Sequence, residues 1–353
     1  MLIKISDPVF QTFLFSVIFL PLLTLSIRKR QDQLFFSQEV TSQLKGLAIL
    51  AIIFSHIGYF LSSDPQFLYP YSILAGVGVN LFLLLSGFGL TVSQLKYPLT
   101  PLQFYKKRLF RLFLPLWVVI TAFFLADFLI LHRSYPATEI IHGFLGFYPG
   151  ADLFQNLDSP LWYFSVIFFL YLIFPLVFIR KLPWVSPVLV LLLSFVILHL
   201  PLPIDPDVLK LYKLHFLAFP LGMLFGLGIQ KIKVKFPGAL KLVFLALAVL
   251  VLLYTAVNSG VNQDPKIEQG ISLITTLSLI VIFSLSRFDF KLLSLFGVYS
   301  YETYLLHWPI LSRYNLYLGL PPFLIVTLNL ALILLLGLVL QKIVNKVTTP
   351  SRK

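Results

Sequence analysis

Two ionisable residues lie deep inside long apolar runs of this sequence, where a charged group is costly, and two others, Asp127 and His307, lie nearer the outer surface. His56 falls within the run 44–62, and Glu302 falls within the run 291–313. An ionisable residue inside a membrane segment marks a functional site by default. His56 is the better candidate for a general base, because histidine has an ordinary pKa of about 6.5 and suits proton transfer near neutral pH. A histidine can also bond two helices together, and the sequence alone leaves these two roles evenly matched.

The spacing of basic residues predicts a common depth for these groups. Lys45 and Lys291 mark the cytoplasmic ends of their runs, and His56 and Glu302 each stand eleven residues further on. At 1.5 Å per residue this places both about 16 Å into a hydrocarbon core about 30 Å thick. Ser86 lies about 15 Å deep on the run 71–95 by the same arithmetic. We therefore expect three polar side chains near the midplane, although shared depth does not establish that they face one another.

A pair of arginines begins the next run at the cytoplasmic side. Arg108 and Arg111 stand at positions i and i+3, so they share one helix face. Guanidinium groups bind phosphate in a bidentate manner. Together with Lys106 and Lys107, the pair could hold the phosphates of a nucleotide-bearing donor such as coenzyme A. Anchoring of a membrane helix by inner positive charge explains the same residues, and taken alone it is the favoured interpretation.

Small and aromatic residues form a second group of candidates. Gly76, Gly78 and the segment 86–89 (Ser-Gly-Phe-Gly) permit close helix packing or leave room for a ligand, and packing is favoured. Trp162 and Tyr163 begin a run at the outer face, where an aromatic belt is the first interpretation and stacking on a sugar ring the second.

Metal and cofactor motifs are not found in the sequence. The remaining histidines lack H-E-x-x-H spacing, the chain has no cysteine, and neither a Gly-rich phosphate loop nor a G-x-S-x-G elbow occurs. We therefore expect no metal site and no thiol nucleophile.

Composition indicates the elements that must position these residues. The 353-residue chain is 58% hydrophobic and 12% charged, with a mean hydropathy of +0.92. Soluble domains carry roughly 25% charged residues. We predict an all-α polytopic bundle of about eleven transmembrane helices, near 8–27, 44–62, 71–95, 108–131, 161–179, 184–200, 208–229, 238–257, 267–286, 291–313 and 321–343.

The basic residues predict the orientation of these helices. With the N-terminus outside and the C-terminus cytoplasmic, 21 of the 27 lysines and arginines fall in inside segments. This is the asymmetry that the positive-inside rule requires, and it accounts for the net charge of +13 without a nucleic-acid partner. Most acidic residues, including Asp152 and Asp158, fall in or beside outside loops. The outside loop 132–160 is equally explained as a substrate entrance or as a connector.

Five motifs, in order, resemble those of acyltransferase family 3, the bacterial membrane acyltransferases that modify surface polysaccharides. They are the segment 44–48 leading to Ser55-His56, the segment 80–88 (Asn-Leu-Phe-Leu-Leu-Leu-Ser-Gly-Phe), the Arg-x-x-Arg segment 104–115, Leu161-Trp162-Tyr163 with Tyr171 and Pro175, and the segment 296–307 ending in His307. The resemblance covers about residues 40–345. Asn80 stands where the family often has an acidic residue, and the run 8–27 precedes the family's usual first helix.

This resemblance implies a membrane-embedded O-acyltransferase of the bacterial plasma membrane. It implies an acyl-CoA donor, with acetyl-CoA expected, and a polysaccharide or lipid-linked glycan acceptor. It also implies His56 as a catalytic residue, and Arg108 and Arg111 contacting the donor, to which we add Lys45. Apart from the resemblance, we expect Glu302 to orient His56 or the acceptor, because a carboxylate can fix a histidine tautomer. The expected substrate pocket contains Ser86, Trp162, Tyr163, Tyr304 and His307. We expect an extra N-terminal helix and linker (1–43), an acyltransferase domain (44–345) and a tail (346–353).

Two other classes of function stay open on the sequence. A proton-coupled transporter or polysaccharide flippase would also use midplane His and Glu residues. A scaffold for a surface-polymer machine would need none of them. The sequence does not name the acceptor glycan or the acyl group, and a homo-oligomer stays open.

Overall fold

The computed structural model describes residues 3–31, 34–150, 159–229, 238–260, 264–314, 316–317 and 319–348. Its helices are α1 (Pro8–Leu25), α2 (Gln38–Ser55), α3 (Tyr69–Ser72), α4 (Ala75–Lys96), α5 (Pro101–Ile130), α6 (Ala137–Leu145), α7 (Trp162–Val177), α8 (Val185–Ile197), α9 (Pro206–His215), α10 (Ala218–Ile229), α11 (Gly238–Asn258), α12 (Pro265–Leu285), α13 (Lys291–Val298), α14 (Ser300–Arg313) and α15 (Pro322–Thr348). A π-helical segment η1 (His56–Leu61) continues α2, and a short 3₁₀ turn η2 (Ser159–Leu161) precedes α7.

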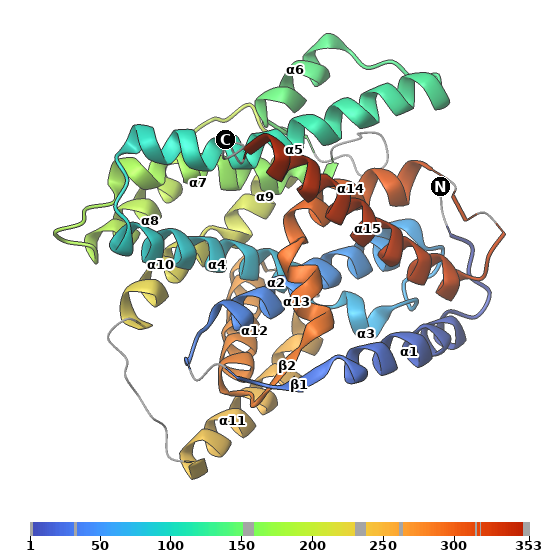
Figure 1. Ribbon diagram of the computed structural model, residues 1–353, viewed down its shortest axis with the longest axis horizontal. Coiled ribbons are helices and arrows are strands. Elements are labelled where there is room, and N and C mark those ends of the chain that lie inside the picture. The colour runs from blue at the N-terminus through green and yellow to red at the C-terminus, as the bar shows by residue number, and fades with distance from the viewer. Residues whose placement is uncertain are drawn as a thin grey trace.

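The predicted helical bundle is confirmed, and each predicted apolar run is helical over most of its length (Figure 1). Within the described ranges, eight helices are long and apolar enough to cross a membrane. Some expectations concern residues outside the described ranges: the acidic loop residues Asp152 and Asp158, the inner lysines Lys231, Lys233 and Lys235, and the tail beyond residue 348.

Capping residues explain why two helices begin before their apolar runs. Ser37 accepts a hydrogen bond from the backbone of Val40, so α2 begins at Gln38, six residues ahead of the predicted start. Thr100 and Gln103 form a reciprocal capping box that begins α5 seven residues before the predicted position. The added turns are amphipathic, and they move Arg108 from the first residue of the helix to the end of its second turn.

Two runs that were predicted as single helices change geometry at the residues of interest. The run 44–62 becomes a π-helix from His56 onward, an irregularity that is frequent at functional sites. The run 291–313 breaks at Tyr299 into α13 and α14. The depth estimate for Glu302 assumed one straight helix, and the structure shows that this assumption was wrong.

Close glycine contacts fix the central helices. An added Cβ at Gly46 of α2 would lie 1.8 Å from the carbonyl oxygen of Leu293 in α13, and one at Gly297 would lie 1.7 Å from that of Ser42. Gly87 of α4 and Gly222 of α10 interlock in the same way, with Cβ positions 2.2 and 1.9 Å from facing carbonyl oxygens. The backbones therefore approach to distances that only glycine allows. For Gly87, the favoured packing role is confirmed.

The N-terminal helix is joined to the rest of the chain by polar contacts. Strand β1 (Ile27–Lys29) pairs antiparallel with β2 (Phe288–Phe290), a short sheet that the sequence did not predict. Beside it the buried carboxylate of Asp289 accepts hydrogen bonds from Arg30 Nε at 3.0 Å and Gln43 Nε2 at 2.8 Å. Helix α1 also packs against α15, while α11 lies at one edge of the bundle (Figure 1).

Candidate functional site

A cavity of about 700 Å³ lies among α2, α4, α5, α7 and α14. Six of the ten residues singled out from the sequence line it: Lys45, Ser86, Arg108, Arg111, Tyr163 and Tyr304. The cavity therefore brings together side chains from five helices. The outermost of the residues just named, Lys45 and Tyr304, are more than 250 residues apart in the sequence. Of the three residues expected to share one depth, Ser86 lines this cavity, whereas His56 and Glu302 are not part of its lining.

One end of the cavity is strongly basic. Lys45, Lys96, Arg108 and Arg111 line it, and none of its described lining residues is acidic. Arg108 donates one hydrogen bond from Nη2 to Ser93 Oγ at 3.0 Å, whereas its buried Nε has no hydrogen-bond partner among the described residues. Four cations without a facing carboxylate repel one another until an anion enters. The geometry thus suits the phosphate groups of a bound molecule.

The neighbouring lysines do not take part in this end of the cavity. Lys106 and Lys107 are exposed and absent from the lining, although they are adjacent in sequence to Arg108. The positive charges of this segment therefore separate into two groups. Arg108 and Arg111 face the cavity, and the lysines have the exposure expected of inner-surface anchors.

The middle of the cavity carries hydroxyl groups and a small residue. Ser86 and Tyr171 lie 3.1 Å apart through their hydroxyl oxygens. Gly89 also lines the cavity, and an added Cβ there would meet no described atom within 4 Å. The sequence left two roles open for these glycines, close packing or room for a ligand. Gly87 packs against α10, whereas Gly89 leaves open volume in the cavity.

Two tyrosines close the other end of the cavity. The rings of Tyr163 and Tyr304 lie 5.6 Å apart, edge to face. Tyr304 is buried, and its hydroxyl donates to the carbonyl oxygen of Pro160 at 2.7 Å. This bond connects α14 to the turn that precedes α7.

Behind Tyr304 lies a pair of histidines. His56 Nδ1 and His307 Nε2 are 2.8 Å apart, with the rings stacked at 5.0 Å and 8°. His307 Nδ1 lies 2.6 Å from the carbonyl oxygen of Tyr304. Tyr304 lines the cavity, and its ring is 5.9 Å from that of His307. Neither histidine lines the cavity itself.

The two histidines differ in their surroundings. His307 is fully buried, whereas His56 is partly exposed beside Phe60 and Trp308. His56 is therefore the member of the pair that a substrate can approach. The pairing itself was not predicted, although His307 stood in the last motif of the sequence analysis.

Glu302 and Trp162 lie away from this pair. The Glu302 side chain packs toward α15, where an added Cβ at Gly337 would lie 3.6 Å from its Cβ and where Gln341 hydrogen-bonds to it. The side chain that hydrogen-bonds to the His56 ring is therefore His307 and not Glu302. Trp162 stacks on His215, 6.0 Å away, and its ring also lies edge to face with that of Tyr163 at 6.3 Å.

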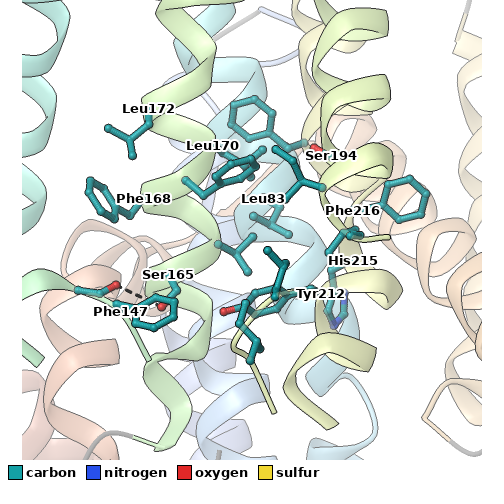
Figure 2. A pocket seen from close by; sticks show the side chains of 18 residues that line it. Leu83, Phe147, Ser165, Phe168, Leu170, Leu172, Ser194, Tyr212, His215 and Phe216 are labelled. Atoms are coloured by element: carbon teal, nitrogen blue, oxygen red, sulfur yellow. Dashed lines mark hydrogen bonds between the residues drawn. The ribbon is translucent and has the colours of Figure 1, made fainter. Parts of the chain in front are cut away.

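Helix α7 and His215 also line a second, apolar cavity of about 330 Å³ (Figure 2). Figure 2 shows four labelled polar side chains amid the Phe and Leu side chains of its lining: Ser165, Ser194, Tyr212 and His215. His215 Nδ1 lies 2.8 Å from Asn80 Oδ1, and Asn80 Nδ2 donates to Ser272. Asn80, the departure from the family pattern, therefore belongs to a buried polar cluster beside this second cavity.

A further buried cluster joins the C-terminal ends of α5 and α14. The Asp127 carboxylate accepts hydrogen bonds from Arg313 at 2.8 Å, from Tyr314 at 2.6 Å and from Tyr135. Burial, with the hydrogen bond to Asp127 as the next cause, raises the pKa of Tyr135 above its ordinary value near 10, so that phenol remains a donor. This cluster is a structural tie between the two helix ends.

The arrangement as a whole can hold an anionic molecule at one end and accept a proton near the other. Residues 42–342 match the model of acyltransferase family 3, described as an acyltransferase domain. No curated protein and no solved structure matches the chain. Within the described residues, no group of three or more His, Cys, Asp or Glu side chains could hold a metal ion.

Proposed function

The chain belongs to this acyltransferase family and is a multi-pass membrane acyltransferase, and on that premise we propose that it moves an acetyl group from acetyl-CoA to a hydroxyl of a cell-surface or exported polysaccharide. The proposed location is the bacterial plasma membrane, with the basic end of the cavity at the cytoplasmic side. The observation that carries the proposal is the cavity, whose described lining has four cations and no carboxylate at one end and lies one tyrosine ring from the His56–His307 pair at the other.

The basic end is proposed to bind the donor. The phosphates of acetyl-CoA would lie against Arg108 and Arg111, with Lys45 beside them, because guanidinium forks bind phosphate oxygens in pairs. The pantetheine arm would extend past Ser86 toward the tyrosine end. A volume of about 700 Å³ lies in the range of ligand sites, roughly 300–1,000 Å³.

His56 is proposed as the general base. Its Nδ1 is taken by His307, so Nε2 is the atom left to accept the proton of the acceptor hydroxyl. The hydroxyl oxygen then attacks the thioester carbonyl, a C–O bond forms and the C–S bond breaks. The coenzyme leaves as a thiolate and receives the proton back from the His56 imidazolium, giving the O-acetyl ester and free CoA.

Tyr304 controls the approach of the two substrates in this scheme. Its ring lines the cavity and lies 5.9 Å from that of His307, and we propose that the thioester reaches His56 when this side chain turns aside. The hydrogen bond to the Pro160 carbonyl holds the ring in place, and breaking it costs about 1 kcal/mol. Tyr163, in contact with Tyr304, completes the same end of the cavity. For Glu302 we propose only a role near the acceptor, and not the orientation of His56.

The test compares surface glycans from cells that carry the gene, cells that lack it, and cells that carry His56→Gln. Mass spectrometry should find an added acetyl mass only with the unaltered gene, with the variant present in the membrane at equal amount. His199→Gln is a matched control, because His199 is exposed and its ring bonds to the Phe195 carbonyl within its own turn. Full acetylation with His56→Gln would remove the base assignment, and an unchanged glycan in all strains would remove the acceptor class.

A further inference from the structure

The hydrogen bonds behind His56 determine which of its ring nitrogens carries a proton. His307 Nδ1 lies 2.6 Å from the Tyr304 carbonyl oxygen. A carbonyl oxygen only accepts hydrogen bonds, so Nδ1 of His307 must carry the hydrogen. The backbone of α14 thereby fixes the state of one imidazole nitrogen without any ionised partner.

This first assignment fixes the other three nitrogens. A neutral imidazole that is protonated at Nδ1 has a lone pair at Nε2. His307 Nε2 lies 2.8 Å from His56 Nδ1, so it can only accept there, and His56 Nδ1 must donate. A neutral His56 that is protonated at Nδ1 then presents an unprotonated Nε2, which is the form that a general base requires.

We infer that His307 is a positioning residue that holds His56 in the tautomer with a free Nε2 lone pair, through the chain from the Tyr304 carbonyl to His307 to His56. The inference rests on the proposed role of His56 as base. It replaces Glu302 by His307 as the group that orients the base, because the contacts of Glu302 are with α15.

The arrangement works only while His307 is neutral. A protonated His307 would donate from both nitrogens, and His56 would then carry its hydrogen on Nε2 and could not act as a base. His307 is fully buried, and a charge there would be desolvated. Among the described residues, its hydrogen-bond partners are a carbonyl oxygen and the other imidazole, and neither is a carboxylate that would stabilise a cation.

The same bond stabilises the transient cation on His56. When Nε2 takes the acceptor proton, the Nδ1–H bond to His307 becomes charge-assisted and therefore stronger. In hydrolase triads an aspartate performs this orienting task, and loss of the correct tautomer there lowers kcat by about 10⁴-fold. Here a neutral imidazole does so, which avoids a second charge beside the base.

Nitrogen-15 NMR of the full chain, labelled at histidine and held in lipid nanodiscs, tests the tautomer directly. Protonated and unprotonated ring nitrogens have separate shifts, and the His56 and His307 signals are assigned by their loss in His56→Gln and His307→Gln. We expect Nδ1 protonated and Nε2 unprotonated in both rings. A His56 ring protonated at Nε2 alone would overturn the inference, whatever the enzyme proves to acetylate.

Two substitutions at one position then test the consequence. His307→Gln keeps an acceptor oxygen for His56 Nδ1–H, whereas His307→Phe keeps a ring and loses the acceptor. We expect kcat to fall by less than about tenfold in the first and by about 10²- to 10⁴-fold in the second. The KM for acetyl-CoA should stay unchanged in both, because His307 does not line the donor cavity.

The outcomes separate this inference from the proposed function. Equal kcat losses in both variants, or a changed donor KM, would indicate a merely structural role and overturn it. If His307→Phe does not fold, the NMR result on the unaltered protein decides alone. Full activity of His56→Gln would remove the proposed base, while the tautomer measured by NMR would stand or fall separately.

Discussion

Removal of one positive charge from the cavity should weaken donor binding far more than removal of a neighbouring one. The perturbation is Arg108→Gln, with Lys107→Gln as its matched control, since both variants lower the net charge by one on the same turn of α5. Arg108 lines the cavity and has a buried Nε without a partner among the described residues, whereas Lys107 is exposed outside it. The pair therefore separates direct contact from general electrostatic attraction.

The magnitude follows from the hydrogen bond that the substitution removes. A hydrogen bond to a charged group contributes about 1.5–3 kcal/mol. One such bond from Nε to a phosphate corresponds to an increase of about 10- to 150-fold in Kd. The control removes a solvent-exposed charge that is screened within about 8 Å at physiological salt, and we expect less than about a threefold change. Arg108→Lys should fall between them, because it keeps the charge and loses the fork.

Isothermal titration of acetyl-CoA into the purified protein measures Kd directly and needs no acceptor. Folding is checked by size-exclusion profile and thermal unfolding; Arg108 makes one side-chain bond within the described residues, to Ser93, so stability should change by only about 1 kcal/mol. A Kd for Arg108→Gln within about twofold of the unaltered protein would refute the donor site, as would equal losses in the two variants. A Kd independent of salt would refute the electrostatic argument.

Two further predictions concern stability and packing. Asp127→Asn leaves the buried guanidinium of Arg313 without its ionised partner and should lower stability by about 3–5 kcal/mol, seen as a lower Tm in detergent, and an unchanged Tm would show that the cluster is dispensable. Gly87→Ala places a Cβ 2.2 Å from the Phe219 carbonyl oxygen and should cost about 1–3 kcal/mol by the same measurement. Gly89→Ala should leave Tm unchanged and alter only acetyl-CoA affinity, because that Cβ points into open volume; equal effects of the two alanines would contradict the assignment.

The sequence was sufficient for the helical bundle because apolar runs of spanning length leave little choice of structure. Backbone polar groups in a bilayer must be satisfied within the segment, which favours helices. The spacing of the basic residues also predicted that Arg108, Arg111 and Lys45 lie toward one side, and the structure places all three on one cavity. The separation of Arg108 from Lys107 was not predicted, because neighbouring residues differ by about 100° around a helix and the sequence does not state which face is inside.

The angular spacing of residues around a helix also explains why the sequence favoured Glu302 over His307 as the partner of His56. Glu302 and His307 are five residues apart, or about 140° around α14, so only one of them can face α2. Depth counted from Lys291 favoured Glu302, but the break at Tyr299 makes that count unreliable, and the sequence has no marker for the break. Likewise Trp162 and Tyr163 are adjacent, yet Tyr163 lines the basic cavity while Trp162 stacks on His215.

Residue types and the approximate positions of the apolar helices are properties of single segments, and the sequence determined them. Contacts between segments depend on helix rotation, on close approach at Gly46, Gly87 and Gly297, and on breaks in helical geometry at His56 and Tyr299. These depend on how all the helices pack together at once. The tertiary structure therefore decided that His56 has an imidazole as its partner and that Tyr304, which lines the basic cavity, has its ring 5.9 Å from that of His307.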